Sequence, residues 1–260
     1  MIVLAALIYL PVWGVTVFGV AMIVAHNALD GLKPEDFGRW SGLWKILHVQ
    51  SMIEVSPNFH FLVLYPLIPW VGVMAAGYGF GVVFTLDSAT RRKWLMRLGL
   101  GLIAAFVVLR WSNLYGDPSA WSAQSRPLFT LFSFLNCTKY PPSLCYLLMT
   151  LGPACLLLAL FERGTPAALR PVLTFGRVPM FYYLLHIPII HGLASLWFHA
   201  HYGRADFFMD GGTGTPPADA GFSLPVVYLI WLGVVVGLYP ACRWFAALKR
   251  RRHDAWLSYF

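Results

Sequence analysis

Six long apolar stretches constrain this chain more than any other feature of its sequence. Each has about 20 residues, the length that a helix needs to cross roughly 30 Å of hydrocarbon. Backbone amides in lipid must be bonded within the protein, and the runs are too long and too evenly apolar for barrel strands, so we expect helices. The predicted fold class is therefore all-α, a polytopic transmembrane bundle. Its full spans are Pro11–Leu29, Phe61–Phe84, Trp94–Trp111, Ser143–Phe161, Val178–Phe198 and Phe222–Phe245.

The composition excludes a water-soluble globular protein. Hydrophobic residues make up 58% of the chain and charged residues 12%, with a mean hydropathy of +0.65. Soluble domains carry roughly 25% charged residues, which they need to cover a surface in contact with water. The net charge of +8 comes from clusters at helix ends, so it predicts contact with the lipid bilayer and not with nucleic acid.

The distribution of charge between alternate loops predicts the orientation. One set of loops holds twelve Lys and Arg residues against three acidic ones, and the other holds seven against eight. Cytoplasmic loops carry the excess of Lys and Arg. We therefore expect the basic tail, residues 246–260, in the cytoplasm and the loops around 30–60, 112–142 and 199–221 outside.

The first ten residues predict a partial span. Met1–Leu10 is apolar from its first residue and has neither the positive segment nor the cleavage site of a signal peptide. Ten helical residues reach only about 15 Å, half of the hydrocarbon thickness. The sequence thus predicts that the chain begins in the middle of a transmembrane helix, with upstream spans missing.

His186 is the first candidate for chemistry. It lies in the apolar run YYLLHIPIIHG, about eight residues from Val178, which places it roughly 12 Å into the membrane. An ionisable residue at that depth usually faces a bundle interior or a wet cavity and has a function. The alternative is a neutral histidine bonded to a neighbouring helix.

His26 and Asp30 form a second candidate site at the outer end of the first full span. They are four residues apart and so share one helix face. A carboxylate beside an imidazole raises its basicity and fixes its tautomer, as a general base requires. The alternative is plain helix termination at Asp30 and Gly31. His60 is predicted level with His26, where the next span begins, and is a further candidate for proton transfer.

Two basic segments are candidates for binding. Lys139 and Tyr140 precede a proline-marked helix start and suit an anionic or polar acceptor, although Tyr and Lys also serve as interface anchors. Arg177 lies at the cytoplasmic mouth of the His186 helix, where a guanidinium can hold a phosphate-bearing donor. The positive-inside rule alone also accounts for it.

The sequence predicts neither a metal site nor a disulfide framework. We expect the four cysteines, Cys137, Cys145, Cys155 and Cys242, to be packing residues, and only the first two lie close enough to one membrane face to pair. His199, His201 and Asp206 have spacing that a metal could use, but no third firm ligand accompanies the histidines.

Five segments of the chain are distinctive as a set. They are HNALDG (26–31), LYPLIPWVGVMAAGYGFG (64–81), LNCTKYPPSL (135–144), MTLGPACLLLALFE (149–162) and LTFGRVPMFYYLLHIPIIH (173–191). Together they resemble the bacterial members of the heparan-alpha-glucosaminide N-acetyltransferase catalytic-domain family, and the likeness extends through most of the chain.

The resemblance implies an acyltransferase of the bacterial inner membrane that moves acetyl from acetyl-CoA to an acceptor, a sugar amine in the lysosomal relative. It implies that residues 1–260 are one transmembrane acyltransferase-like domain, the C-terminal part of the family domain. Family members carry further N-terminal spans with an Arg-Gly-marked helix, an Asp-His pair and the main acid-base histidine. This chain starts after them.

Two other functions fit the same residues. In a small-solute transporter or channel, the histidines would form a proton relay and the Pro-marked helices would act as gates. In a non-catalytic scaffold, the Pro/Gly-rich helices would simply pack closely. The acceptor and a homo-oligomeric state stay open.

Overall fold

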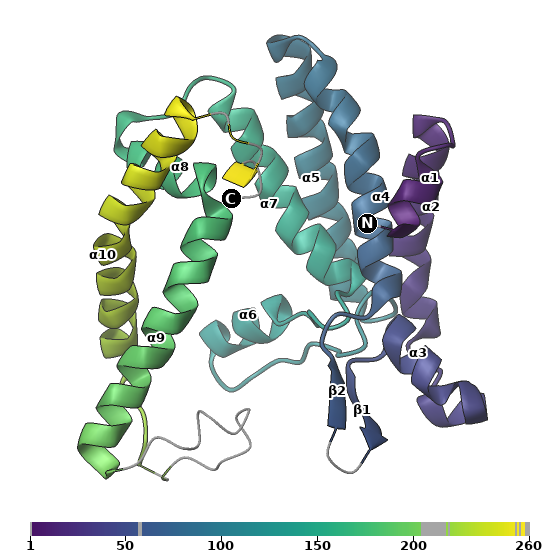
Figure 1. The fold of residues 1–260 in the computed structure, drawn as a ribbon. Coiled ribbons are helices and arrows are strands. Elements are labelled where there is room, and N and C mark those ends of the chain that lie inside the picture. The colour runs from purple at the N-terminus through teal and green to yellow at the C-terminus, as the bar shows by residue number, and fades with distance from the viewer. Residues whose placement is uncertain are drawn as a thin grey trace. The chain divides into compact units, whose positions relative to one another are not determined.

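The structure is a computed structural model that describes residues 2–56, 59–203, 217, 219–252, 254, 256 and 257. The chain divides into two compact units, Met1–Gly164 and Thr165–Phe260 (Figure 1). Each is described by itself. The predicted external connection around Asp206 and DGGTGTPPADAG lies largely outside the described residues.

The first unit holds four of the span-length segments. In chain order its elements are α1 (Ile2–Leu7), α2 (Val12–Ala25), η1 (His26–Leu29), η2 (Pro34–Trp40), α3 (Ser41–His48), β1 (Ser51–Ser56), β2 (Phe59–Val63), α4 (Leu67–Phe80), η3 (Gly81–Thr85), α5 (Ser88–Ser112), α6 (Pro127–Leu135) and α7 (Leu144–Phe161). Helix α2 packs on α4 and α5 packs on α7. A core of Phe106, Leu144, Cys145 and Leu148 lies between α5 and α7, with Ile23 of α2 against it.

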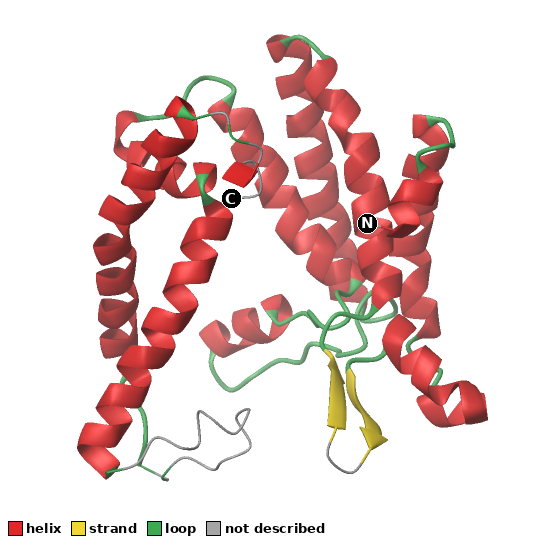
Figure 2. Cartoon of the chain, in the orientation of Figure 1, coloured by secondary structure: helices red, strands yellow, loops and turns green. Residues whose placement is uncertain are grey.

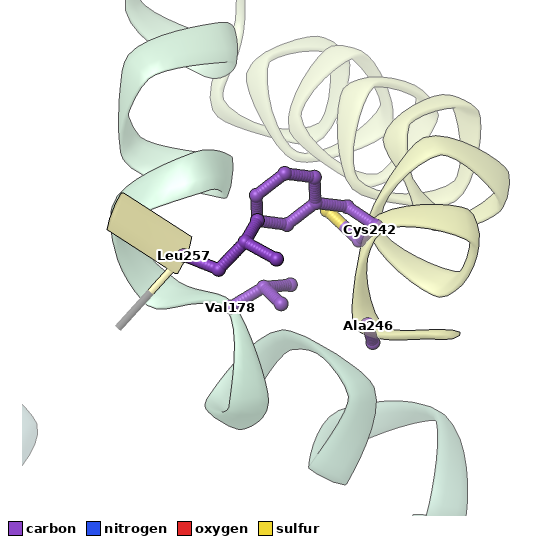
Figure 3. Close-up of a cluster of buried hydrophobic side chains, with 5 residues drawn as sticks. Val178, Cys242, Ala246 and Leu257 are labelled. Carbon is purple, nitrogen blue, oxygen red and sulfur yellow. The ribbon is translucent and has the colours of Figure 1, made fainter. Parts of the chain in front are cut away.

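The second unit holds the other two span-length helices. It contains η4 (Ala167–Leu169), α8 (Arg170–Arg177), α9 (Pro179–Tyr202) and α10 (Leu224–Arg251). A small core closes the end at which α9 begins and α10 ends (Figure 3). Its buried members are Val178, Cys242, Phe245, Ala246 and Leu257.

The predicted number of spans is confirmed. Six segments of the described chain are long and apolar enough to cross a membrane: Val12–Leu29, Leu67–Thr85, Ser88–Ser112, Leu144–Phe161, Pro179–Tyr202 and Leu224–Arg251. Helix α1, with six residues, is the predicted partial segment. The starts of α5 and α7 follow from capping, because the side chains of Asp87 and Ser143 accept the free backbone N–H groups of Thr90 and Tyr146.

The predicted start of the second span is wrong. Residues 59–63 form β2, which pairs antiparallel with β1 in a hairpin (Figure 2), and the helix begins only at Leu67, after Pro66. His60 is therefore not at the entrance of a span. It lies exposed on the hairpin, opposite Glu54.

Candidate functional site

Two networks of polar side chains in the first unit lie at one end, which we call the hairpin end, whereas the Arg91–Glu162 ion pair lies at the other. Helices α2 and α5 finish there and α4 and α7 begin there, while α3, α6 and the β1–β2 hairpin extend from it (Figure 1). The end thus contains the segments that connect α2 with α4 and α5 with α7, where polar side chains are least costly to place.

Three side chains of this end form a compact cluster, the His26–Asp30–His48 cluster. One ligand-capable atom from each lies within 4.8 Å of those from the other two. His26 and His48 are 1% and 3% exposed, whereas the Asp30 side chain keeps 20% exposure. Nε2 of His48 lies 3.8 Å from Oδ1 of Asp30 and 3.1 Å from the carbonyl oxygen of His26. The structure thus brings the predicted pair His26 and Asp30 together and adds His48.

Helix α3 carries His48 to this position. It is amphipathic, and it buries Trp44 and His48, which are four residues apart on one face. The rings of Trp44 and His48 stack at 5.2 Å, and Trp44 in turn stacks on Phe37. Nε1 of Trp44 donates to the carbonyl oxygen of Leu32, which ties α3 to the segment that follows Asp30. The ring of His48 is therefore held from two sides.

Asn27 joins the cluster to α7. Its amide nitrogen donates to Oδ2 of Asp30 at 2.8 Å, and its Oδ1 accepts the backbone N–H of Leu144 at 2.9 Å. Backbone N–H groups in the first turn of a helix have no acceptor within the helix, and the N–H of Leu144 is one of these groups in α7. Asn27 therefore orients the Asp30 carboxylate and fixes the end of α2 against the start of α7.

The pKa of Asp30 lies above the usual range of an aspartate. Burial is the main cause because it disfavours the charged form, and the negative charge of Asp117 acts in the same direction. The hydrogen bond from Asn27 and the proximity of His48 oppose the shift. Asp30 therefore holds a proton more readily than an exposed aspartate.

A second buried network lies beside the first. Arg110, 2% exposed, donates to the carbonyl oxygens of Phe134, Ser119, Ser133 and Asn136, and its Nη1 lies 3.7 Å from Oδ1 of Asp117. Asp117 accepts from the backbone and hydroxyl groups of Thr138 and from the hydroxyl of Ser143. These bonds hold the segments on both sides of α6 to α5 and α7, so the network is structural support for the hairpin end.

Lys139 and Tyr140 lie together at the same end. Nζ of Lys139 lies 5.1 Å from the centroid of the Tyr140 ring, which packs edge-on against Tyr65. A side-chain hydrogen bond between the two residues raises the pKa of Lys139 and lowers that of Tyr140. Lys139 is exposed, and its ammonium group already has Tyr140 as a partner.

His186 and Arg177 belong to the second unit. The ring of His186 stacks on Tyr182 at 4.9 Å, and Nδ1 donates to the Tyr182 carbonyl oxygen at 3.0 Å. This bond leaves Nε2 with its lone pair when the ring is neutral. The bond described for His186 lies within α9, whereas the alternative interpretation placed it on a neighbouring helix. Arg177 is exposed at the end of α8, one residue before the buried Val178.

The remaining predicted residues are not members of the cluster. His60 is on the hairpin, as described above. His201 stacks on Trp197 near the end of α9, and Asp206, its predicted companion, lies outside the described residues. All four cysteines are free, as the packing prediction expects.

Sequence reasoning missed His48, Arg110 and Asp117. A signal for His48 was present, because SGLWKILH is a short amphipathic stretch with tryptophan and histidine four residues apart. Arg110 lies at the end of the apolar run Trp94–Trp111, and the sequence indicates no partner for its charge there.

Comparisons with protein-family models, with curated proteins and with solved structures gave no match.

Proposed function

We propose that this chain is an integral-membrane acyltransferase, or the C-terminal part of one, of the family that its five segments resemble. The proposed reaction moves acetyl from acetyl-CoA to a sugar or another amine or hydroxyl acceptor. The observation that carries the proposal is the His26–Asp30–His48 cluster, in which two buried imidazoles lie beside one carboxylate at the end of a membrane span.

The cluster has the groups that acyl transfer requires. The acceptor nitrogen or oxygen attacks the thioester carbonyl carbon, and a base must take the acceptor proton as the new bond forms. The carbon–sulfur bond then breaks, and the CoA thiolate leaves and is protonated. An imidazole of His26 or His48 is the proposed base, and Asp30, held by Asn27, stabilises the imidazolium that results.

The other predicted residues have supporting roles in this proposal. Lys139 and Tyr140, at the same end as the cluster, contact the acceptor. Arg177 binds a CoA phosphate through its exposed guanidinium. His186, with Nε2 free to accept a proton, transfers protons within the second unit.

The charge distribution supports a sidedness for these roles. Arg177 follows the fourth full span and lies in a basic connection, whereas the His26–Asp30–His48 cluster follows the first full span. Three spans, an odd number, separate the two, so a chain that crosses the membrane at each span has them on opposite sides. With the basic side in the cytoplasm, CoA binds from the cytoplasm and the acceptor binds outside, in the inner membrane of a bacterial cell.

The proposal is tested with membranes that contain the full chain and with control membranes that lack it. Both receive acetyl-CoA labelled in the acetyl group, together with methyl glucosaminide as an amine acceptor or methyl glucoside as a hydroxyl acceptor. The release of CoA thiol and the label in the acceptor are measured in parallel. We expect both to rise together only in membranes that contain the chain.

Two results contradict this proposal. The first is the absence of label from both added acceptors and from every membrane component. The second is release of CoA thiol without any labelled product, which indicates hydrolysis of acetyl-CoA. A His186→Ala variant that transfers acetyl at the rate of the unchanged chain removes His186 from the proposed set.

A small-solute transporter is the second candidate, and the observation that favours it is proline inside three span-length helices. Pro153, Pro188 and Pro240 lie inside α7, α9 and α10, which continue past them. Proline removes a backbone hydrogen bond from a helix, and weakened positions of this kind occur at substrate sites of transporters. Uptake of a labelled solute into vesicles without any dependence on acetyl-CoA supports this candidate over the first.

A further inference from the structure

We propose that His26, Asp30 and His48 bind a divalent transition-metal ion, with zinc as the ion that their chemistry favours. The sequence alone predicts no metal, because His48 is 22 residues from His26 and no spacing motif connects them. The inference does not depend on the proposed acyl transfer.

His26 carries the strongest evidence. The residue is 1% exposed, yet neither ring nitrogen makes a hydrogen bond of ordinary geometry, although the backbone of Pro142 lies near the ring. Buried polar atoms in folded proteins nearly always have a partner, so an exception calls for an explanation. A cation at the cluster supplies the missing partner to one nitrogen.

The distances allow one ion to contact all three side chains. Their ligand atoms lie within 4.8 Å of one another. Ligands of a tetrahedral zinc ion, at about 2.0–2.2 Å from the metal, are about 3.4 Å apart. The widest pair therefore has to close by at most about 1.5 Å, and the partly exposed Asp30 side chain has the freedom to move.

The surroundings resemble the outer shell of a metal site. Ligating carboxylates and imidazoles are usually held by further hydrogen bonds and packing, which fix their orientation. Asn27 holds one oxygen of Asp30 and leaves the other facing His48. Nε2 of His48 lies 3.1 Å from the carbonyl oxygen of His26 and exchanges this hydrogen bond for the ion when the ion binds, while Trp44 stacks on the same ring.

The donor set selects the class of ion. Calcium and magnesium prefer six or more oxygen ligands, whereas imidazole nitrogens suit zinc and its first-row neighbours. Two histidines and one carboxylate are a frequent set for a zinc ion that keeps its fourth position for water or substrate. An imidazole nitrogen that binds the ion cannot accept a proton, so the metal-bound and proton-accepting forms exclude each other.

The test uses the full chain, purified in detergent with an affinity tag that contains no histidine. After chelator treatment, the protein is dialysed against a low concentration of Zn²⁺, and the bound metal is measured. We expect about one Zn²⁺ per chain, with a thermal midpoint that rises with the Zn²⁺ concentration. With Co²⁺ in place of Zn²⁺, we expect the visible absorption of a nitrogen- and oxygen-ligated ion.

Matched variants locate the ion. Asp30→Asn removes a ligand, and its control, Glu35→Gln, removes an exposed carboxylate five residues away. His48→Gln is compared with His60→Gln, an exposed histidine of the hairpin end. We expect binding at least about tenfold weaker in both ligand variants and unchanged binding in both controls. His48→Cys should keep the ion and add a thiolate-to-cobalt charge-transfer band.

The His48→Cys variant keeps the test decisive if His48→Gln fails to fold, because the new band requires Co²⁺ at this position. The proposal is overturned if the folded, unchanged protein binds no Zn²⁺. It is also overturned if Asp30→Asn binds Zn²⁺ as tightly as Glu35→Gln does, or if folded His48→Cys gives no such band with Co²⁺.

Discussion

Arg110 shows how one residue determines the local stability of the hairpin end. Its guanidinium is 2% exposed and its donors reach four carbonyl oxygens and Asp117. A buried charge without partners is strongly unfavourable. Loss of any one member of this network therefore leaves another member with an unpaired buried charge or polar group.

Removal of one member should therefore destabilise the protein strongly. In Arg110→Ala, the buried Asp117 carboxylate loses its cation, and we expect a loss of about 3–5 kcal/mol in the free energy of unfolding. The thermal midpoint in detergent micelles measures it. The control is Arg126→Ala, at an exposed arginine just before α6. Equal midpoints for the two variants would contradict this account of Arg110.

Cys137 should be unreactive despite its place in a loop. Burial raises the pKa of its thiol to about 12, and the Asp117 carboxylate adds to the shift against the opposing Arg110. The higher pKa means less thiolate, a fraction about 1000-fold smaller at pH 8 than for a thiol with the usual pKa. Maleimide should therefore label Cys137 far more slowly than a cysteine introduced by Ser125→Cys, which is exposed in the same segment. Equal labelling rates would show that the thiol is not shielded.

The sequence predicts two of the three residues of the His26–Asp30–His48 cluster. His26 and Asp30 could be paired because their separation of four residues is a local property of a helix. His48 reaches them only because α3 turns back along the end of α2, and no local pattern determines that turn. The partners of Arg110 could not be predicted either, because they come from segments up to 26 residues further along the chain and no local pattern brings them together.

At the scale of elements, the contact between α2 and α4 depends on glycine. A Cβ atom at Gly19 would overlap the backbone nitrogen of Ala76 and would lie 2.7 Å from the carbonyl oxygen of Gly72. Small residues of this kind allow membrane helices to approach closely.

Gly19→Ala should therefore push α2 and α4 apart. We expect a loss of about 1–3 kcal/mol in stability, seen as a lower thermal midpoint in micelles. Gly14→Ala on the same helix is the control, because a Cβ there meets nothing closer than 3.6 Å. A variant at Gly19 as stable as the one at Gly14 would mean that the two helices do not meet in this way.

The helices were predictable as elements, and the hairpin was not. An apolar run long enough to cross the membrane can satisfy its backbone hydrogen bonds in lipid only as a helix. All six predicted spans are therefore helical in the structure, although their ends differ from the predicted ones. Residues 59–63 are apolar as well and merged with the run that follows. The two short runs SMIEVS and FHFLV around Pro57 and Asn58 carry the signal of a hairpin, but a criterion of about 20 apolar residues does not detect strands of this length.

At the scale of the whole molecule, the charge asymmetry predicts a cytoplasmic C-terminus. Alkaline phosphatase is active only outside the cytoplasm, so its fusion after Phe260 should be inactive and its fusion after Ser125 active. A green fluorescent protein in the same two positions should give the opposite pattern. Phosphatase activity at the C-terminal fusion and none at Ser125 would reverse the proposed orientation and the sides assigned to CoA and the acceptor.

The central claim is acyl transfer that depends on the His26–Asp30–His48 cluster, and one comparison tests it most directly. Membranes containing the full chain, its Asp30→Asn variant or its Glu35→Gln variant are given labelled acetyl-CoA and methyl glucosaminide. We expect transfer by the unchanged chain and by Glu35→Gln, and a rate about 100-fold lower in Asp30→Asn at equal protein level. No transfer by the unchanged chain, or full transfer by Asp30→Asn, would contradict the account.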